Sequence, residues 1–385
     1  MEKMQLNKSP PICAMVSHFR NKDQLDLVHF SSPGTVLIKG FEVEKKNLCD
    51  LGQQKWMSLS ESDYSSKGYI VFLGKFYAAE GSDTVVGLNF VDFCRDYYTR
   101  LWITYRTGMP PLLDSEVTSD CGWGCMIRTT QMAFAQAIVT NRLGRGWRYF
   151  GPKPKLLRDE SLPHIEGDPL YNSQIDIIKL FEDMPSAPLG IHRLLEIFVN
   201  EYDENPIGKW YTPSQVIFLF KSLMILHSRK ALRTSASPLT CDLSLMLAND
   251  GRVIVDDAER ECHYWSKRLL LFIPLRLGTN VVNPIYTDHI CQLLSQKTCL
   301  GLLGGRPDHS LYFIGYYDNH VIYLDPHVAQ EYAPISMWED LSSCKGITEE
   351  EKVCCRHYCV AHIEDDLQKV AFSFAKNASQ AKNYT

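Results

Sequence analysis

One segment constrains the fold of this chain more than any other: a glycine-rich turn that runs directly into a long apolar stretch. Residues 120–125 read Asp-Cys-Gly-Trp-Gly-Cys, and apolar residues then recur at helical spacing as far as Val139. Gly144 supplies a stop signal. The pattern predicts a buried helix that begins at or beside Cys125. A chain of 385 residues can enclose such a helix in a core without help from metal or disulfides.

The composition indicates a globular protein without a basic surface. Apolar residues make up 45% of the chain, and 40 basic against 45 acidic residues give a formal net charge of −5. Nucleic-acid binding needs clustered positive charge, so we do not expect a nucleic-acid partner. The 13 cysteines are scattered, and the first 19 residues contain no apolar signal-peptide core. Both features favour reduced thiols and a cytoplasmic location.

The hydrophobic pattern predicts an α+β fold. Residues 312–317 and 321–324 have strand character, with 318–320 as the turn of a hairpin, and residues 266–277 predict a further strand. Helices are expected at 191–198 and after Pro213. We expect a flexible N-terminal arm at 1–30, one catalytic domain at 31–330 and a divergent C-terminal segment at 331–385. The six prolines within 151–188 favour irregular structure there.

A cysteine at a helix start suits nucleophilic catalysis. The attacking species is the thiolate, and the free N–H groups of a helix N-terminus stabilise both it and the oxyanion of an attacked carbonyl. Gly122 and Gly124 would let a substrate backbone approach closely, because they lack a Cβ atom. Two alternatives remain open at this point: Cys125 is a buried structural cysteine, or Cys121 in the entering turn is the nucleophile.

A base for this cysteine is predicted at the end of the hairpin, in Asp325-Pro326-His327. Residues i and i+2 of an extended chain project to the same side, and Pro326 biases Asp325 toward extended geometry. A neighbouring carboxylate selects the tautomer of an imidazole and raises its pKa. The alternative is a surface turn with an incidental histidine. The Cys/His cluster at 354–362 has poor spacing for tetrahedral zinc, so neither a metal nor another cofactor is expected.

Several blocks that follow one another in a fixed order resemble the autophagins, the autophagy-related cysteine peptidases. The blocks lie at residues 100–106, 118–128, 143–147, 207–214, 273–278, 304–307, 312–316 and 323–327. The resemblance runs from about Leu73 to Gln330. Beyond Gln330 the usual C-terminal block of the family is not recognised.

The resemblance implies a papain-like cysteine peptidase fold with a small auxiliary subdomain. It also implies a catalytic triad of Cys125, His327 and Asp325, the residues that the local patterns select independently. By the same matching, the Tyr105 hydroxyl would assist in stabilising the oxyanion and Trp210 would lie over the substrate groove. The stretch before Gly304 would be a loop that gates this groove.

The activity implied by the resemblance is that of a cysteine endopeptidase. Such an enzyme cleaves ubiquitin-like autophagy modifier precursors after a C-terminal glycine and deconjugates the modifiers from phosphatidylethanolamine. Peripheral membrane contact is expected only through the lipidated substrate. Residues 338–341, Trp-Glu-Asp-Leu, form a candidate docking motif for these modifiers, with an amphipathic turn as the alternative. The alternative functions are a catalytically impaired modifier-binding protein, owing to the atypical C-terminus, and a different papain-like enzyme such as a deubiquitinase.

Overall fold

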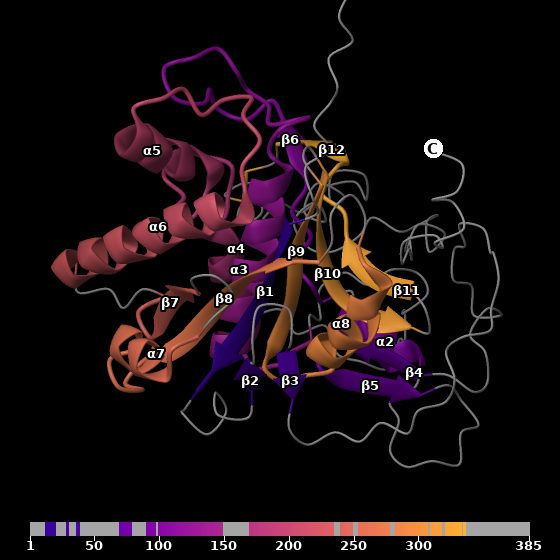
Figure 1. Ribbon diagram of the computed structural model, residues 1–385. Coiled ribbons are helices and arrows are strands. Elements are labelled where there is room, and N and C mark those ends of the chain that lie inside the picture. Colours follow the sequence, from indigo (N-terminus) through magenta and orange to yellow (C-terminus); the bar gives the residue numbers. More distant parts are fainter. Residues whose placement is uncertain are drawn as a thin grey trace, which may run out of the picture.

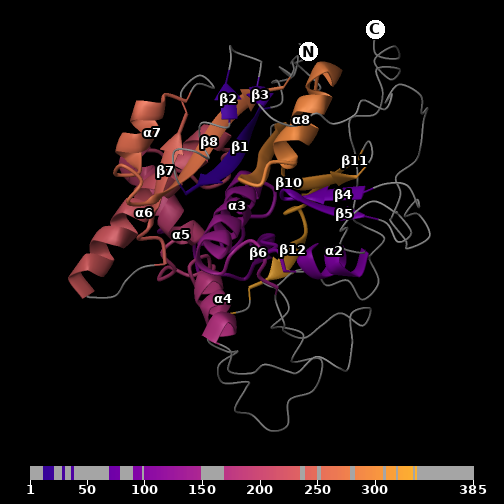
Figure 2. The same ribbon diagram turned by 90° about the horizontal axis from the view of Figure 1, so that it is seen from below.

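The apolar runs of the sequence form one mixed sheet that helices cover on both faces (Figure 1 and Figure 2). The computed structural model describes residues 12–20, 28–30, 36–38, 69–78, 90–97, 99–148, 169–234, 239–248, 253–277, 282–306, 309–317, 320–332 and 334–335. Among these residues the main sheet has eight strands.

The main sheet is antiparallel except at one edge. Its order is β5 (Lys75–Ala78), β4 (Tyr69–Phe72), β10 (His309–Tyr317), β9 (Cys299–Arg306), β1 (Ile12–Phe19), β8 (Arg268–Arg276) and β7 (Leu243–Leu247). β11 (His320–Leu324) pairs with β10, and β7 runs parallel to β8. Two short ladders join β2 (Val28–Phe30) to β3 (Val36–Ile38), and β6 (Tyr105–Thr107) to β12 (Ala329–Glu331).

Alternation along β8 explains why helices lie on both faces of the sheet. The described helices are α2 (Phe90–Tyr97), α3 (Cys125–Arg142), α4 (Pro169–Lys179), α5 (Ile191–Tyr202), α6 (Pro213–Thr234), α7 (Val255–Glu261) and α8 (Thr287–Leu294), with a 3-10 turn at Pro284–Tyr286. Leu270 and Phe272 face the larger core, which contains residues of α3, α5 and α6. Leu269 and Leu271 face the smaller core, which contains residues of α7 and α8. Side chains of a strand point alternately to opposite faces, so both faces of β8 are buried.

Three stacked aromatic rings fix α3 to the sheet. Phe134 of α3 stacks on Phe220 of α6 at 4.6 Å between ring centroids and on Phe272 of β8 at 5.3 Å. All three rings are fully buried. Burial and stacking of such large side chains contribute strongly to stability, so the helix that begins at Cys125 has a fixed place on the sheet.

The α+β prediction is confirmed, and so are several of its elements. The strand expected at 266–277 is β8, the expected hairpin is β10–β11, and the expected helices are α5 and α6. The expected hairpin turn lies partly outside the described residues, at 318–319. None of the described helices is long and apolar enough to cross a membrane.

The structure differs from the expected N-terminal arm over residues 12–19 and 28–30. β1 lies between β8 and β9 and pairs antiparallel with both, in a register that joins Ile12 to Arg276 and to Gly305. A strand in this position satisfies backbone groups on both neighbours, which would otherwise be sheet edges. This contact is long-range, and no local periodicity in the sequence reports it.

Two other expectations are wrong in part. The stretch 151–188 was expected to favour irregular structure, but its residues 169–179 form α4, which begins at a proline, a residue tolerated in the first turn of a helix. A gating loop was expected before Gly304, but residues 299–306 form β9, and Leu302 and Leu303 are buried in the two cores. The stretch before Gly304 therefore belongs to the sheet.

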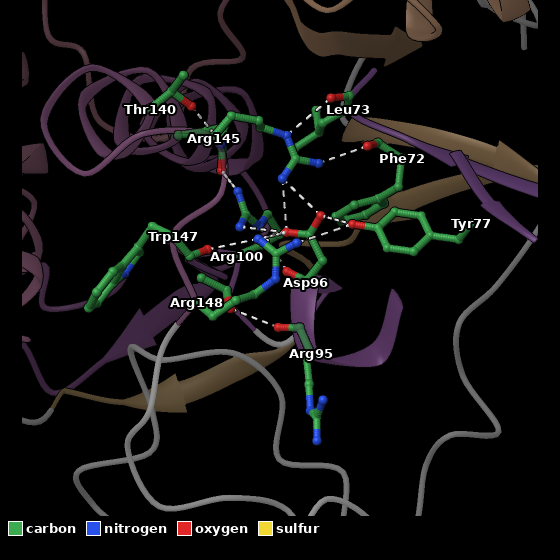
Figure 3. A network of polar contacts seen from close by, with 12 residues as sticks. Phe72, Leu73, Tyr77, Arg95, Asp96, Arg100, Thr140, Arg145, Trp147 and Arg148 are labelled. Carbon is green, nitrogen blue, oxygen red and sulfur yellow. Dashed lines mark hydrogen bonds and ion pairs between the residues drawn. The ribbon is translucent and has the colours of Figure 1, made fainter. Parts of the chain in front are cut away.

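A buried carboxylate, Asp96 at the end of α2, connects the edge strands to the loop after α3 (Figure 3). Arg100, Arg145 and Arg148 each place a guanidinium nitrogen 2.8–2.9 Å from it, and the Tyr77 hydroxyl donates a short hydrogen bond to it. Burial raises the pKa of Asp96, but the three guanidinium groups outweigh this effect and hold that pKa below its usual value. The carboxylate is thus charged and ties together segments that are distant in sequence.

Candidate active site

The turn before α3 presents Cys125 as the first residue of a helix, as predicted. The amides of Trp123 and Gly124 donate hydrogen bonds to the Asp120 carbonyl oxygen at 3.3 Å and 2.9 Å, which closes the turn. Gly122 has φ +85°, a left-handed conformation that favours glycine. No side chain caps the helix start. The free N–H groups and the positive end of the helix dipole are therefore available beside the Cys125 thiol.

The Asp120 side chain holds this turn against the buried core. It accepts hydrogen bonds from the backbone N–H of Arg106 at 2.8 Å and from the Arg128 Nε at 2.7 Å. Arg128 also pairs with Asp183 at 2.6 Å, and the Arg106 guanidinium lies 3.6 Å from the same carboxylate. The side chains of these two arginines and two aspartates are fully buried. Their charges balance, as burial of ionic groups requires.

Gly124 is required by this anchoring. A Cβ atom at this position would lie 2.2 Å from Oδ2 of Asp120, well inside contact distance. Since Asp120 is held on the other side by Arg106 and Arg128, it has no room to withdraw. The sequence pattern alone assigns this glycine to close approach of substrate. The structure gives it a packing role against Asp120 as well.

Asp325 and His327 follow directly after β11 and lie side by side, as the i, i+2 pattern predicts. Oδ1 of Asp325 accepts a hydrogen bond from the backbone N–H of His327 at 2.9 Å and lies 2.5 Å from its Nδ1. The indole of Trp102 donates to the Asp325 carbonyl oxygen at 2.7 Å. The carboxylate therefore holds Nδ1 and leaves Nε2 as the free nitrogen of the ring.

The charge states of these two groups favour an ion pair. Burial lowers the pKa of His327, but the hydrogen bond to Asp325 and the nearby Cys125 thiol outweigh it and raise that pKa to about 9. Burial raises the pKa of Asp325, but its hydrogen bonds to His327 outweigh it and lower that pKa. Nε2 is buried without a well-formed hydrogen bond among the described residues. In enzymes, a contact between a nucleophile and its base is often loose before substrate binds.

Tyr105, on β6, lies against both halves of the site. Its ring is 5.5 Å from that of His327 and meets it edge to face at 89°. Its hydroxyl is buried without a well-formed hydrogen bond, and burial together with the charge of Cys125 raises its pKa. The hydroxyl is therefore a protonated donor with unused capacity beside the thiol.

A second histidine, which the sequence patterns did not select, stacks on the ring of His327. The ring of His309 stacks on that of His327 at 4.3 Å and 14°. His309 is the first residue of β10 and pairs with Arg306, the last residue of β9. Twelve histidines are scattered through the chain, and only the fold shows which one lies here.

Of the other residues that the sequence singled out, the structure describes Cys121 and Trp210, and two C-terminal segments lie outside the described residues. Cys121 is exposed in the entering turn, four residues before the first residue of α3. Trp210 lies in the loop between α5 and α6, packed on the larger core, and within the described residues no hydrogen bond or ring contact joins it to Cys125 or His327. The described residues contain no cluster of metal-ligand type. The Cys/His cluster at 354–362 and the motif at 338–341 lie outside the described residues.

Comparisons with known proteins point to one family. Residues 90–378 match the family model Peptidase C54, the peptidase C54 catalytic domain. Over 302 residues the chain is 45% identical to "Cysteine protease atg-4.2" of Caenorhabditis elegans, an alignment that covers 78% of this chain and 56% of that relative. Over 318 residues it is 31% identical to "Cysteine protease ATG4D" of Xenopus laevis, covering 73% and 64% of the two chains. The chain thus spans less than two thirds of the length of both relatives.

The family match also corrects where the resemblance ends. The motif blocks stop at about Gln330, but the family model continues to residue 378. In the structure β12 runs across Gln330, and Ile335 beyond it is fully buried in the larger core. The chain therefore does not leave the family pattern at Gln330, and the reason for expecting an impaired enzyme is lost.

Proposed function

The chain belongs to the peptidase C54 family, and we propose on this basis that it is a cysteine peptidase with Cys125 as its nucleophile. One observation carries the proposal: the backbone N–H groups of Tyr105 and Arg106 bind the Pro326 carbonyl oxygen, beside His327, and the Asp120 carboxylate, before Cys125, at 2.9 Å and 2.8 Å. Asp325 in turn holds Nδ1 of His327. The proposed nucleophile comes from one part of the chain, and the proposed base and orienting carboxylate come from a distant segment in which they are two residues apart. This arrangement is what cysteine catalysis requires.

The proposed reaction proceeds through a thioester. His327 takes the proton of Cys125, and the resulting thiolate attacks the scissile carbonyl carbon. The oxyanion is stabilised by the backbone N–H of Cys125 and by the Tyr105 hydroxyl. His327 then donates its proton to the leaving amine, and water, activated by the same imidazole, hydrolyses the thioester.

We propose that the substrates are ubiquitin-like autophagy modifiers, cleaved after a C-terminal glycine. The support is the sequence resemblance together with relatives that are themselves named as ATG4 cysteine proteases. Deconjugation of the modifier from phosphatidylethanolamine is the second part of the proposal, because an amine leaves from a glycine carbonyl in both reactions. Membrane contact would then be peripheral, through the lipidated substrate, and the enzyme would act in the cytoplasm.

Trp210 and the auxiliary subdomain complete the proposed substrate site. We propose that Trp210 covers the groove when substrate is bound, since its indole N–H is buried without a hydrogen bond in the described residues. α5 and α6, which flank Trp210 in sequence, are the candidates for the auxiliary subdomain. They share the larger core with the sheet, so such a subdomain would be an integral part of the domain.

Cleavage of a purified modifier precursor tests the proposal. The wild-type chain should release the residues that follow the glycine, and Cys125→Ala should abolish the release while its circular dichroism spectrum stays unchanged. Cys121→Ala is the matched control and should retain activity, because that thiol is exposed and lies outside the helix start. Cleavage by Cys125→Ala at the wild-type rate, or loss of cleavage in Cys121→Ala alone, would show that the nucleophile is wrong.

A further inference from the structure

The imidazole of His327 contacts two aromatic rings, and the proposed reaction uses only one of them. The Tyr105 ring lies 5.5 Å from it at an interplanar angle of 89°. The His309 ring stacks on it at 4.3 Å and 14°. A near-parallel ring at this distance is in full stacking contact.

The strand start that carries His309 packs against α3, the helix that begins at Cys125. The neighbouring residue, Ser310, is fully buried, and its hydroxyl lies 2.9 Å from that of Thr129 and 3.7 Å from the sulfur of Met126. Thr129 and Met126 belong to the first turns of α3. The position of the His309 ring is therefore fixed relative to the same helix start as the thiol.

The bond from Asp325 to Nδ1 does not by itself determine the plane of the His327 ring. The ring can still tilt about the line that joins Nδ1 to the carboxylate oxygen, and any tilt moves Nε2 away from the thiol. A flat ring stacked against one face of the imidazole opposes this tilt. Proton transfer between thiol and imidazole depends steeply on such alignment.

We propose that His309 is a positioning residue for catalysis, whose ring holds the His327 imidazole in the plane in which Nε2 meets the Cys125 thiol. This inference rests on the proposed function, because it assigns His309 a part in the same reaction. His309 lies over the face of the imidazole, where neither ring nitrogen of His327 can hydrogen-bond to it. The proposal therefore assigns it a role through the orientation of His327, not as a second base.

Replacement of His309 by Ala, Leu and Phe tests this assignment. His309→Ala should lower kcat by about twofold to tenfold, the range expected for loss of one ring-stacking contact, with KM nearly unchanged. His309→Phe keeps a flat ring without a titratable group and should restore kcat to near the wild-type value. His309→Leu has similar bulk but no ring plane and should behave like His309→Ala. His289→Ala, on α8, is the matched control and should match the wild type.

A second measurement separates this inference from the proposed function. The rate at which iodoacetamide alkylates Cys125, followed by mass spectrometry of the Cys125 peptide, reports the thiol–imidazole pair without any peptidase substrate. The rates should fall in His309→Ala and His309→Leu and recover in His309→Phe. If the wild type cleaves no modifier but these rates still differ, the proposed substrate is wrong and the positioning role stands.

Two results would overturn the positioning role. One is wild-type kcat and alkylation in folded His309→Ala. The other is equal activity of His309→Leu and His309→Phe, which would mean that a flat ring is not needed. If circular dichroism shows that His309→Ala does not fold, the comparison of kcat and alkylation rate between His309→Leu and His309→Phe is sufficient to test the role.

Discussion

Replacement of Asp325 by Asn tests how far one carboxylate sets the charge state of His327. Oδ1 of Asp325 accepts the backbone N–H of His327 and lies 2.5 Å from Nδ1. The pKa of His327 is raised from 6.5 to about 9, and this carboxylate is the largest favourable cause. Asn keeps the shape of the side chain and removes its charge.

The expected magnitude follows from exposure and bonding. A hydrogen bond to a charged group contributes about 1.5–3 kcal/mol, and the Asp325 side chain is 42% exposed, so solvent screening favours the lower end. A loss of about 1.5 kcal/mol corresponds to about one pKa unit and to about tenfold in rate. We therefore expect Asp325→Asn to lower kcat/KM about tenfold and to lower the pKa of His327 by about one unit.

The assay is kcat/KM for precursor cleavage as a function of pH, with Asp114→Asn as a control at an exposed carboxylate before α3. The active form needs a protonated His327, so the basic limb of the profile should lie near pH 9 in the wild type and move to lower pH in Asp325→Asn. An unchanged basic limb would refute the assigned role of Asp325.

Stability should follow the same titration. Since folding raises the pKa of His327, the folded state binds more protons between about pH 6.5 and pH 9. The stabilisation is fully present below that range and is lost as the pH rises through it. Denaturant unfolding of the wild type should therefore show a decrease in the free energy of unfolding over this range, and the decrease should be smaller in Asp325→Asn.

Two further predictions concern the groups that hold the site and the sheet edge. Gly124→Ala forces a Cβ atom to within 2.2 Å of the fixed Asp120 carboxylate. Alkylation of Cys125 should therefore slow, and urea unfolding should show that the free energy of unfolding falls by about 1–3 kcal/mol. Gly146→Ala, where a Cβ meets open space, should change neither quantity. Asp96→Asn leaves the guanidinium groups of Arg100, Arg145 and Arg148 without their shared carboxylate. The free energy of unfolding should therefore fall by about 3–5 kcal/mol. A decrease below about 1 kcal/mol would contradict the importance of this network.

The parts of the site that the sequence predicts are those encoded locally. The turn at 120–125 and the helix after it depend on glycine conformation and apolar spacing over a few residues, and the structure has α3 at Cys125. The pairing of Asp325 with His327 needs only an extended chain and a proline between them. These features are visible in one sequence because each depends on near neighbours.

The parts that the sequence does not predict depend on contacts between distant segments. His309 reaches His327 because β10 starts beside α3, and nothing in the local sequence distinguishes it from the other histidines. β1 lies inside the sheet because β8 and β9 leave a place for it. The eight residues of β1 follow a proline-containing segment and show no regular alternation of apolar and polar residues that would predict that place.

β6 explains how the two halves of the site stay in register. The backbone N–H of Tyr105 donates to the Pro326 carbonyl oxygen at 2.9 Å, which holds the histidine side. The next N–H, that of Arg106, donates to the Asp120 carboxylate at 2.8 Å, which holds the cysteine side. Successive N–H groups of a strand point in opposite directions, so two adjacent residues can bind both halves at once. Because Tyr105 is one of those residues, its hydroxyl is positioned by the same strand that sets the distance between Cys125 and His327.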